Sequence, residues 1–233
     1  MTKATLFASP AWPTVPVKGE DAAYPVHRIF CVGRNYAAHA AEMGVAVDRE
    51  APFYFTKSAL MTQQSGATIP VPPGTSNFHY EMELVIAIGA PAFKADKSAA
   101  AQAIYGYACG LDMTRRDLQL DARAKQRPWD IGKDVEQSAV FAPITRSAEM
   151  GAIGPQRIHL EVNGEVRQDA RLDDLIWKVE EIVSHLSHYY HLAPGDLIMT
   201  GTPAGVGAVV AGDVITGGID GLDPIRLTIG SAE

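Results

Sequence analysis

The sequence is poor in cysteine and in long hydrophobic runs. Its 233 residues include two cysteines, Cys31 and Cys109, which lie far apart in separate apolar stretches. This argues against a disulfide framework or a thiolate metal site, so we interpret both as small core residues in a reducing compartment. No apolar run reaches the roughly 18 residues of a membrane span, and the N-terminal segment lacks the continuous apolar core of a signal peptide. We therefore expect a cytoplasmic protein with no membrane partner.

Positive charge is also scarce. The chain carries 20 basic and 27 acidic residues, for a formal net charge of −7. Nucleic acids and anionic membrane surfaces bind proteins that present concentrated positive charge. We therefore expect no nucleic-acid partner.

The chain is long enough for one large domain with a short N-terminal addition. Residues 1–26 hold four prolines and show little periodicity, so we expect an extended arm or a small irregular lobe there. Residues 27–233 would form the main domain. The hydrophobic fraction of 47% is sufficient for a substantial core.

Short strands alternate with turns and a few helices along this main domain. We predict strands over 28–33, 52–58 and 79–89, and helices over 35–44, closed by Gly44, and over 115–127. Asn163-Gly164 is the strongest hairpin signal. The longest helix is expected within 172–196, with an apolar stripe of Leu175, Ile176, Val179, Ile182, Val183 and Leu186. Since no regular βαβ rhythm is present, the pattern favours an α+β, mostly β fold.

Two carboxylates stand at the start of a hydrophobic strand. In the segment 79–89, HYEMELVIAIG, Glu81 and Glu83 share one face because strand side chains alternate. Two carboxylates about 4 Å apart repel by roughly 4 kcal/mol at an effective dielectric near 20. Such a pair must be solvated, share a proton or hold a cation. An isolated Glu-x-Glu is most often the solvent side of a strand, so the decision depends on the rest of the chain.

A third carboxylate ends another predicted strand. In the segment 105–114, YGYACGLDMT, small side chains alternate with large ones and lead to Asp112, so we expect room beside this aspartate. If Asp112 meets Glu81 and Glu83, the oxygen ligands select a hard ion, Mg²⁺ or Mn²⁺, with Ca²⁺ as the alternative. Three protein ligands would leave coordination positions open for water and substrate.

Four motifs in fixed order give the chain a family resemblance: CVGRNYAAHAAEMG, HYEMELVIAIG, GYACGLDMTRRDLQ and GDLIMTGTPAGVGAVVAGD. From about residue 27 to the C-terminus, the chain resembles the fumarylacetoacetate hydrolase family, and DMTRRDLQ with RPWDIGK is similar to its short bacterial acylpyruvate hydrolases. The resemblance implies a mixed β-sandwich roll of the family's C-terminal-domain type, usually a homodimer. It also implies Mg²⁺ or Mn²⁺ on Glu81, Glu83 and Asp112. The implied substrate is a small 2-oxo acid of the acylpyruvate type, with fumarylpyruvate expected.

The same resemblance implies roles for residues that would otherwise be surface residues. His39 and Glu42 match a His/Glu pair that shares a helix face, so Glu42 would orient the imidazole while His39 takes a proton from water. Lys133 matches an active-site lysine that stabilises developing negative charge. The positions that match substrate contacts are Arg34, Gln119, Thr202 and Lys57. Thr202 belongs to a glycine loop, 201–207, whose N–H groups and hydroxyl suit a carboxylate.

Several alternatives stay open. Asp134 directly follows Lys133, where relatives carry a different sequence, and this acid is a competing partner for the lysine. His79 is either part of the site or a loop residue, and Arg34, Arg115 or Arg116 would bind a fumaryl carboxylate. We expect no metal site from His185, His188 and His191, which lie on the polar side of a helix.

Two other functions fit the same motifs. One is decarboxylation of oxaloacetate, or isomerisation or dehydration of a 2-oxo acid, on the same metal site. These reactions need no attacking water. The other is a non-catalytic metal-binding protein, although a base beside the ion argues for catalysis.

Overall fold

Strands dominate the structure, as the sequence predicts. The computed structural model describes residues 5–8, 10–42, 44 and 49–232. Within these residues, the largest sheet has eight strands in the order β4-β3-β15-β8-β9-β11-β5, with β12 paired to β9. Its strands are β3 (Arg28–Gly33), β4 (Phe53–Lys57), β5 (Thr62–Gln64), β8 (Met82–Ile88), β9 (Ile104–Asp112), β11 (Ala139–Phe141), β12 (Thr145–Arg146) and β15 (Asp196–Met199).

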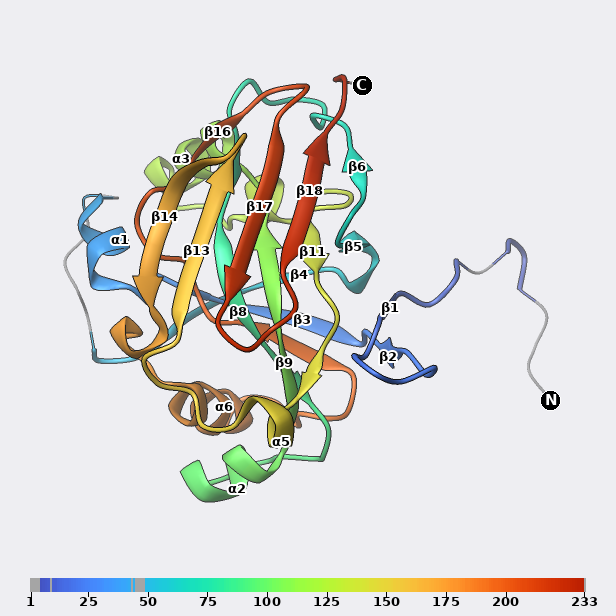
Figure 1. Ribbon diagram of the computed structural model, residues 1–233, viewed down its shortest axis with the longest axis vertical. Coiled ribbons are helices and arrows are strands. Elements are labelled where there is room, and N and C mark those ends of the chain that lie inside the picture. The colour runs from blue at the N-terminus through green and yellow to red at the C-terminus, as the bar shows by residue number, and fades with distance from the viewer. Residues whose placement is uncertain (1–4, 9, 43, 45–48, 233) are drawn as a thin grey trace.

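A second, five-stranded sheet lies across the first (Figure 1). Its order is β14-β13-β17-β18-β6, and β13 to β14 is the hairpin expected at Asn163-Gly164, where both turn residues have positive φ. Its strands are β6 (Thr68–Ile69), β13 (Arg157–Val162), β14 (Glu165–Arg171), β17 (Val214–Ile219) and β18 (Ile225–Ile229). A three-stranded sheet adds β7 (Phe78–Tyr80), β10 (Thr114–Arg115) and β16 (Gly207–Val209). The mostly β, curled-sheet architecture confirms the predicted fold class.

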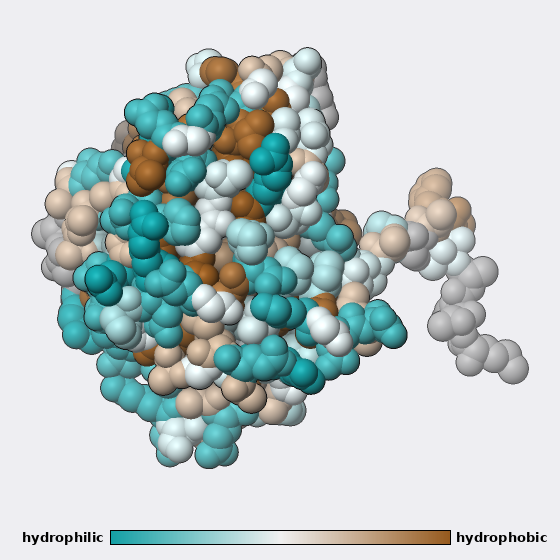
Figure 2. Space-filling model, in the orientation of Figure 1, coloured by the Kyte–Doolittle hydropathy of each residue, from teal (hydrophilic) through white to brown (hydrophobic). Residues whose placement is uncertain are grey.

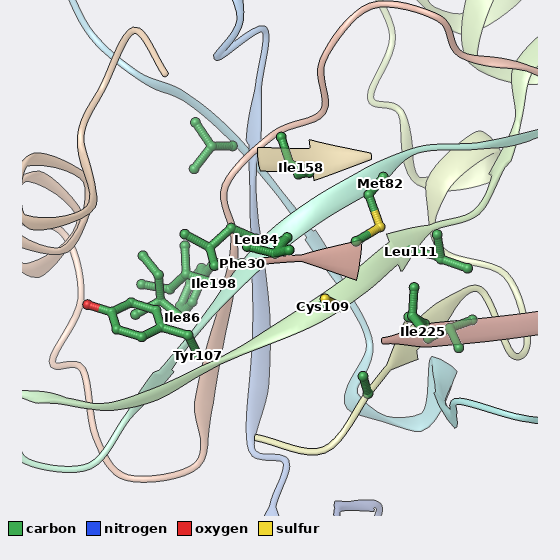
Figure 3. Packing of buried hydrophobic residues seen from close by; sticks show 14 of the residues in the cluster. Phe30, Met82, Leu84, Ile86, Tyr107, Cys109, Leu111, Ile158, Ile198 and Ile225 are labelled. Carbon is green, nitrogen blue, oxygen red and sulfur yellow. The ribbon is translucent and has the colours of Figure 1, made fainter. Parts of the chain in front are cut away.

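The main core lies between the two large sheets. Figure 3 shows Leu84 and Ile86 of β8 packed among residues from several other strands, including Ile158 of β13. The opposite face of the eight-stranded sheet packs on a second cluster that includes Val85 and Met199. Every residue of β8 is therefore buried, because the strand is covered on both faces.

The helices are short and lie at the margins of the sheets. They are α1 (Ala37–Glu42), α2 (Lys97–Gln102), α3 (Arg116–Ala124), α4 (Asp130–Lys133), α5 (Ser147–Met150) and α6 (Val179–Ser187), with single 3-10 turns η1 (Ala59–Met61) and η2 (Leu172–Asp174). Among the described residues, none of the helices has the length and hydrophobicity that a membrane crossing requires.

The helix expected within 172–196 is shorter than its apolar stripe suggests. Leu175 and Ile176 are buried, as predicted, but they precede α6. The backbone N–H groups of Ile176 and Trp177 instead donate to the backbone oxygen and the side-chain Oδ1 of Asn35, at 2.8 and 2.7 Å. A distant asparagine therefore replaces the helical acceptors, and the helix begins only at Val179.

The N-terminal segment has two parts. Residues 14–26 contain the strand pair β1 (Thr14–Val15) and β2 (Tyr24–Pro25), and they contribute Val15 and Val26 to the second core cluster. Residues 5–8 extend away from the body, as Figures 1 and 2 show, and Leu6 is 96% exposed. The domain boundary at residue 26 stays a prediction.

The small residues of β9 do not create free space beside Asp112, contrary to our expectation. A Cβ added to Gly106 would lie 2.3 Å from the backbone oxygen of Thr145, and one added to Gly110 would lie 2.5 Å from Cγ2 of Val85. These glycines permit close approach of β12 and β8 to β9. The neighbouring strands fill the space that the sequence pattern left open.

Gly106→Ala should destabilise the fold by about 2 kcal/mol or more, because a backbone oxygen cannot easily retreat from the added methyl group. Urea unfolding of the variant measures this loss. Gly154→Ala is the matched control, since its Cβ would meet no atom closer than 4.0 Å. Equal stability of the two variants would contradict the close packing at β9.

Candidate metal centre and active site

Three buried carboxylates converge where β7, β8 and β9 meet. Glu81 lies between β7 and β8, Glu83 lies on β8, and Asp112 ends β9. The N–H of Asp112 donates to the backbone oxygen of Glu81 at 2.9 Å, which sets the two residues opposite one another. One oxygen from each side chain lies within 4.8 Å of the others. Among the described residues, this is the one acidic, histidine or cysteine group with that property.

The electrostatics of this trio favour a cation. Burial, followed by the charges of Asp112 and Glu81, raises the pKa of Glu83 well above its usual range. Burial also tends to raise the pKa of Glu81, but the charges of Lys133 and Arg116 outweigh this effect and hold that pKa below its usual range. Among the described residues, the one hydrogen-bond donor to Glu83 is the N–H of Gly201, at 2.7 Å.

The oxygen set fits a hard divalent ion. Oδ1 of Asp112 is buried and accepts no hydrogen bond from the described residues, although Lys57 Nζ lies 2.9 Å away. All three N–H groups of this lysine have other acceptors: Met113 O, Ser138 Oγ and Lys133 O. Mg²⁺ and Mn²⁺ prefer oxygen ligands, and this site offers three carboxylates, one of which has an oxygen without a hydrogen-bond donor among the described residues.

Two lysines flank the acids from different sides. Lys133 Nζ donates to Glu81 Oε2 at 2.7 Å and to Asp112 Oδ2 at 2.6 Å. Burial tends to lower the pKa of Lys133, but the charges of Asp112 and Glu81 outweigh it and raise this pKa, so the lysine stays charged. Asp134 does not compete for Lys133, because its Oδ1 accepts from the N–H of Ser58 at 2.7 Å.

Lys57 is buried beside Asp112 and does not line the pocket, so we predict that it stabilises the fold. A substrate contact of Lys57 stays a prediction. Lys57→Met should lower the free energy of unfolding by about 3 kcal/mol or more, because it leaves a buried aspartate with one cation fewer. Urea denaturation measures the change. Lys97→Met is the control, since its 67% exposed side chain forms an ion pair on the surface and should contribute less than about 1 kcal/mol. A loss of similar size in both variants would contradict this interpretation.

The His39 and Glu42 pair lies on α1 as the spacing predicts. Nδ1 of His39 is 3.1 Å from Oε2 of Glu42, and His39 is buried. Gly44 closes the helix with φ of +67°, and its N–H donates to Ala41 O, whereas Met43 lies outside the described residues. Glu42 also accepts from the N–H of Gly205 at 3.2 Å. The carboxylate is therefore held against the imidazole by a second segment of the chain.

Arg116 and His79 form a polar layer behind Glu81. Arg116 donates to Glu81 Oε1 and to Gln119 Oε1, and its Nε lies 3.4 Å from His79 Nδ1. His79 Nε2 lies 2.8 Å from Asn77 Oδ1. Burial, followed by the charge of Arg116, lowers the pKa of His79 to about 4. The neutral imidazole accepts from Arg116 and donates to Asn77, so His79 positions the arginine.

One pocket connects most of these groups. Its wall contains seven of the predicted site residues: Arg34, His39, Glu81, Glu83, Gln119, Lys133 and Thr202. Asp112, Lys57 and Glu42 do not line it, but each contacts at least one other residue of the site. The wall also contains Phe55, Arg116, Arg123, Trp129 and Gly201. The structure therefore gathers all ten predicted residues around a single pocket.

The glycine loop differs from our expectation. Its N–H groups at Gly201 and Gly205 bind the protein's own Glu83 and Glu42, so these donors are not available for a substrate carboxylate. Gly201 has φ of +97°, a region that favours glycine, and this backbone geometry accompanies the N–H contact to Glu83. Thr202 Oγ1 accepts from Gln168 Nε2 at 2.8 Å, which leaves its own O–H to donate. A substrate contact of Thr202 stays a prediction.

Sequence reasoning missed the contacts of Arg116 and the aromatic wall. Arg116 precedes Gln119 by three residues on α3, and this spacing was the available signal that they share a helix face. Phe55 and Trp129 come from segments far apart in sequence, so no local pattern marked them. His185 stacks on Tyr54 and His188 is exposed, and neither belongs to a metal-binding group among the described residues.

A concave pocket with buried acids, a charged lysine and a histidine paired with a glutamate is the architecture of an enzyme that acts on a small molecule. Residues 28–230 match the family model for the fumarylacetoacetate (FAA) hydrolase C-terminal domain. The chain belongs to the fumarylacetoacetate hydrolase family.

The relatives are similar over most of their length. A fumarylpyruvate hydrolase of Ralstonia sp. is 57% identical over 197 residues, which cover 82% of this chain and 100% of the relative. A mitochondrial oxaloacetate tautomerase of Arabidopsis thaliana is 40% identical over 87% of this chain and 90% of the relative. The crystal structure of fumarylpyruvate hydrolase from Pseudomonas aeruginosa, in complex with Mn²⁺ and pyruvate, has a TM-score of 0.93 and 45% identity, and covers 98% of this chain and 100% of that chain.

Proposed function

We propose that this chain hydrolyses a carbon–carbon bond of an acylpyruvate, and that its principal substrate is fumarylpyruvate, which yields fumarate and pyruvate. The observation that carries the proposal is the buried acidic trio beside the His39 and Glu42 pair, in a chain 57% identical to a fumarylpyruvate hydrolase. Water adds to the acyl carbon, the bond to the pyruvate methylene carbon breaks, and that carbon receives the electron pair and then a proton.

Glu81, Glu83 and Asp112 would hold a Mn²⁺ or Mg²⁺ ion, with Ca²⁺ as an alternative, and the ion would supply Lewis acidity for the 2-oxo acid. The pocket residues supply the proton transfers. Because Nδ1 of His39 faces the carboxylate of Glu42, this nitrogen carries the hydrogen and Nε2 keeps the lone pair. His39 therefore removes a proton from water through Nε2, and Glu42 stabilises the imidazolium that results.

Lys133 stabilises the negative charge that develops on the departing pyruvate enolate. A carbanion is a poor leaving group, so the developing enolate needs fixed positive charge nearby. The Lys133 ammonium lies 2.7 Å from Glu81 and 2.6 Å from Asp112 and lines the pocket, so it supplies positive charge beside two of the three acids. We also propose that the substrate contacts Arg34, Gln119 and Thr202, which line the pocket.

Single-turnover assays with purified protein test this proposal. Fumarylpyruvate, acetylpyruvate and oxaloacetate are offered separately under Mg²⁺ and under Mn²⁺, and products are followed by NMR. We expect equimolar fumarate and pyruvate from fumarylpyruvate. Absence of cleavage under both ions would refute the hydrolase proposal, and metal binding without turnover of any substrate would favour a non-catalytic role.

A second candidate is tautomerisation of oxaloacetate, which the 40% identical Arabidopsis relative favours. The same assays distinguish the two functions, because exchange between keto and enol forms leaves the carbon skeleton intact. Decarboxylation of oxaloacetate, our earlier alternative, would release pyruvate without fumarate.

We further propose that the chain works as a cytoplasmic homodimer in gentisate degradation. The two buried free cysteines suit a reducing compartment. The exposed apolar side chains of Leu6, Phe7 and Trp12 support assembly, because a partner surface would remove them from water. Sedimentation equilibrium should give twice the 25.0 kDa mass of the chain, and a monomer at micromolar concentration would contradict the dimer.

A further inference from the structure

The pocket at the acidic trio continues into a second hollow at the surface. Four residues line both: Arg34, Phe55, Arg123 and Trp129. The inner hollow contains the acids, whereas the outer one adds Phe53, Tyr54 and Tyr190 together with residues 126–128. The two hollows therefore meet at these four shared residues, which we call the ring.

Arg34 is held firmly at this ring. Its guanidinium carbon lies 5.7 Å from the ring centres of both Phe53 and Trp129, which meet edge to face at 4.9 Å. Its φ is +60°, a conformation that a residue with a Cβ rarely adopts and that is often found at functional sites. No carboxylate of the described residues forms an ion pair with it. The chain holds this cation in place without supplying its counterion.

Arg123 adds a second positive charge at the same ring. Burial, followed by the charge of Arg123, lowers the pKa of Arg34, which places the two guanidinium groups within electrostatic reach of each other. Both residues line the inner and the outer hollow, so a carboxylate bound at the ring would lie near two guanidinium groups.

Arg115 and Arg116, the other two candidates for a fumaryl carboxylate, are held by contacts within the protein. Arg115 donates to the backbone oxygens of Ile131 and Pro73 at 2.9 and 3.1 Å, which hold it away from the pocket. Arg116 is buried and donates to Glu81 and Gln119. Of the three arginines that the sequence left as alternatives for a fumaryl carboxylate, only Arg34 lies at the ring without an acidic partner among the described residues.

We propose that Arg34 and Arg123 bind the carboxylate at the far end of the acyl group, and that Phe55 and Trp129 enclose the flat chain leading to it. The inference rests on the proposed function and deepens it. The acidic trio and the base act on the 2-oxo acid end, whereas the ring selects acyl groups that are planar and end in a carboxylate. Fumarylpyruvate has both features, and acetylpyruvate has neither.

Arg34→Gln and Arg123→Gln test the selection. Glutamine keeps a Cβ at position 34, so the backbone strain is retained while the charge is removed. The kcat/KM ratio of fumarylpyruvate to acetylpyruvate should fall about 10- to 100-fold, because a charge-assisted bidentate contact is lost with one substrate only. Lys125→Gln is the control. Lys125 follows Arg123 at the end of α3 and pairs with Asp121 on the surface, so its loss should leave the ratio unchanged. Equal losses on both substrates would overturn the proposal.

Calorimetric binding separates this proposal from the proposed function. Fumarate and crotonate share a planar four-carbon chain, but crotonate has a methyl group in place of the second carboxylate. Arg34→Gln should weaken fumarate at least about tenfold and crotonate far less. If the wild type cleaves neither substrate, the proposed function fails, and loss of fumarate affinity alone would still support the ring. If the wild type cleaves both substrates and Arg34→Gln binds fumarate as tightly as the wild type does, the ring does not bind the acyl carboxylate. The hydrolase proposal then stands without it.

Discussion

Glu83→Gln and Asp112→Asn should each lower kcat/KM for fumarylpyruvate by at least about 10³-fold. Each change removes one of three converging oxygen ligands, and Lewis-acid stabilisation of a departing carbanion contributes several kcal/mol. Steady-state kinetics under saturating Mn²⁺ measure the loss. Glu165→Gln is the control, because its side chain is 69% exposed on β14, distant from the trio in sequence and outside the pocket wall. Activity of either ligand variant within about tenfold of the wild type would contradict the roles we assign.

Stability distinguishes a lost ligand from a damaged fold in Glu83→Gln. Burial and the charges of Asp112 and Glu81 raise the pKa of Glu83, so above its unfolded-state pKa the ionised side chain opposes folding. A neutral glutamine removes this opposition. In the presence of a chelator, the variant should therefore unfold at neutral pH at the same temperature as the wild type or a higher one, as thermal denaturation will show. A clear drop in that temperature would mean that the carboxylate supports the fold itself.

His39→Ala should lower single-turnover hydrolysis of fumarylpyruvate by about 10²- to 10⁴-fold, the usual contribution of a positioned general base. Mn²⁺ affinity should change little, because the trio stays intact. Any exchange between keto and enol oxaloacetate that depends on the trio alone should persist. His188→Ala is the matched control, because that histidine is exposed at the end of α6.

The result that would contradict this role is hydrolysis within about threefold of the wild type. Glu42→Gln provides a finer test. It keeps the shape beside His39 but removes the negative charge that stabilises the imidazolium, so its loss should be smaller than that of His39→Ala. A larger loss would indicate that Glu42, rather than His39, takes the proton.

Local sequence patterns predicted much of the site. Strand alternation put Glu81 and Glu83 on one face, and the antiparallel pairing of β8 with β9 then brought Asp112 opposite them. Helical spacing put His39 beside Glu42. These relations depend on backbone periodicity, which a single sequence displays directly.

What the sequence could not supply depends on contacts between distant segments. Asn35 accepts hydrogen bonds from the N–H groups of Ile176 and Trp177, so the expected helix begins only at Val179. Thr145 and Val85 pack against Gly106 and Gly110 of β9, where we expected free space. The same is true of Gly201 and Gly205, whose N–H groups bind protein carboxylates rather than substrate. In each case a tertiary partner overrides a local preference, and no periodicity identifies that partner.

Titration calorimetry of Mn²⁺ into chelator-treated wild-type protein measures whether the three carboxylates bind a metal ion. We predict uptake of one ion per chain, and loss of that uptake in Asp112→Asn. An absence of binding in the wild type, or equal binding in the variant, would contradict it.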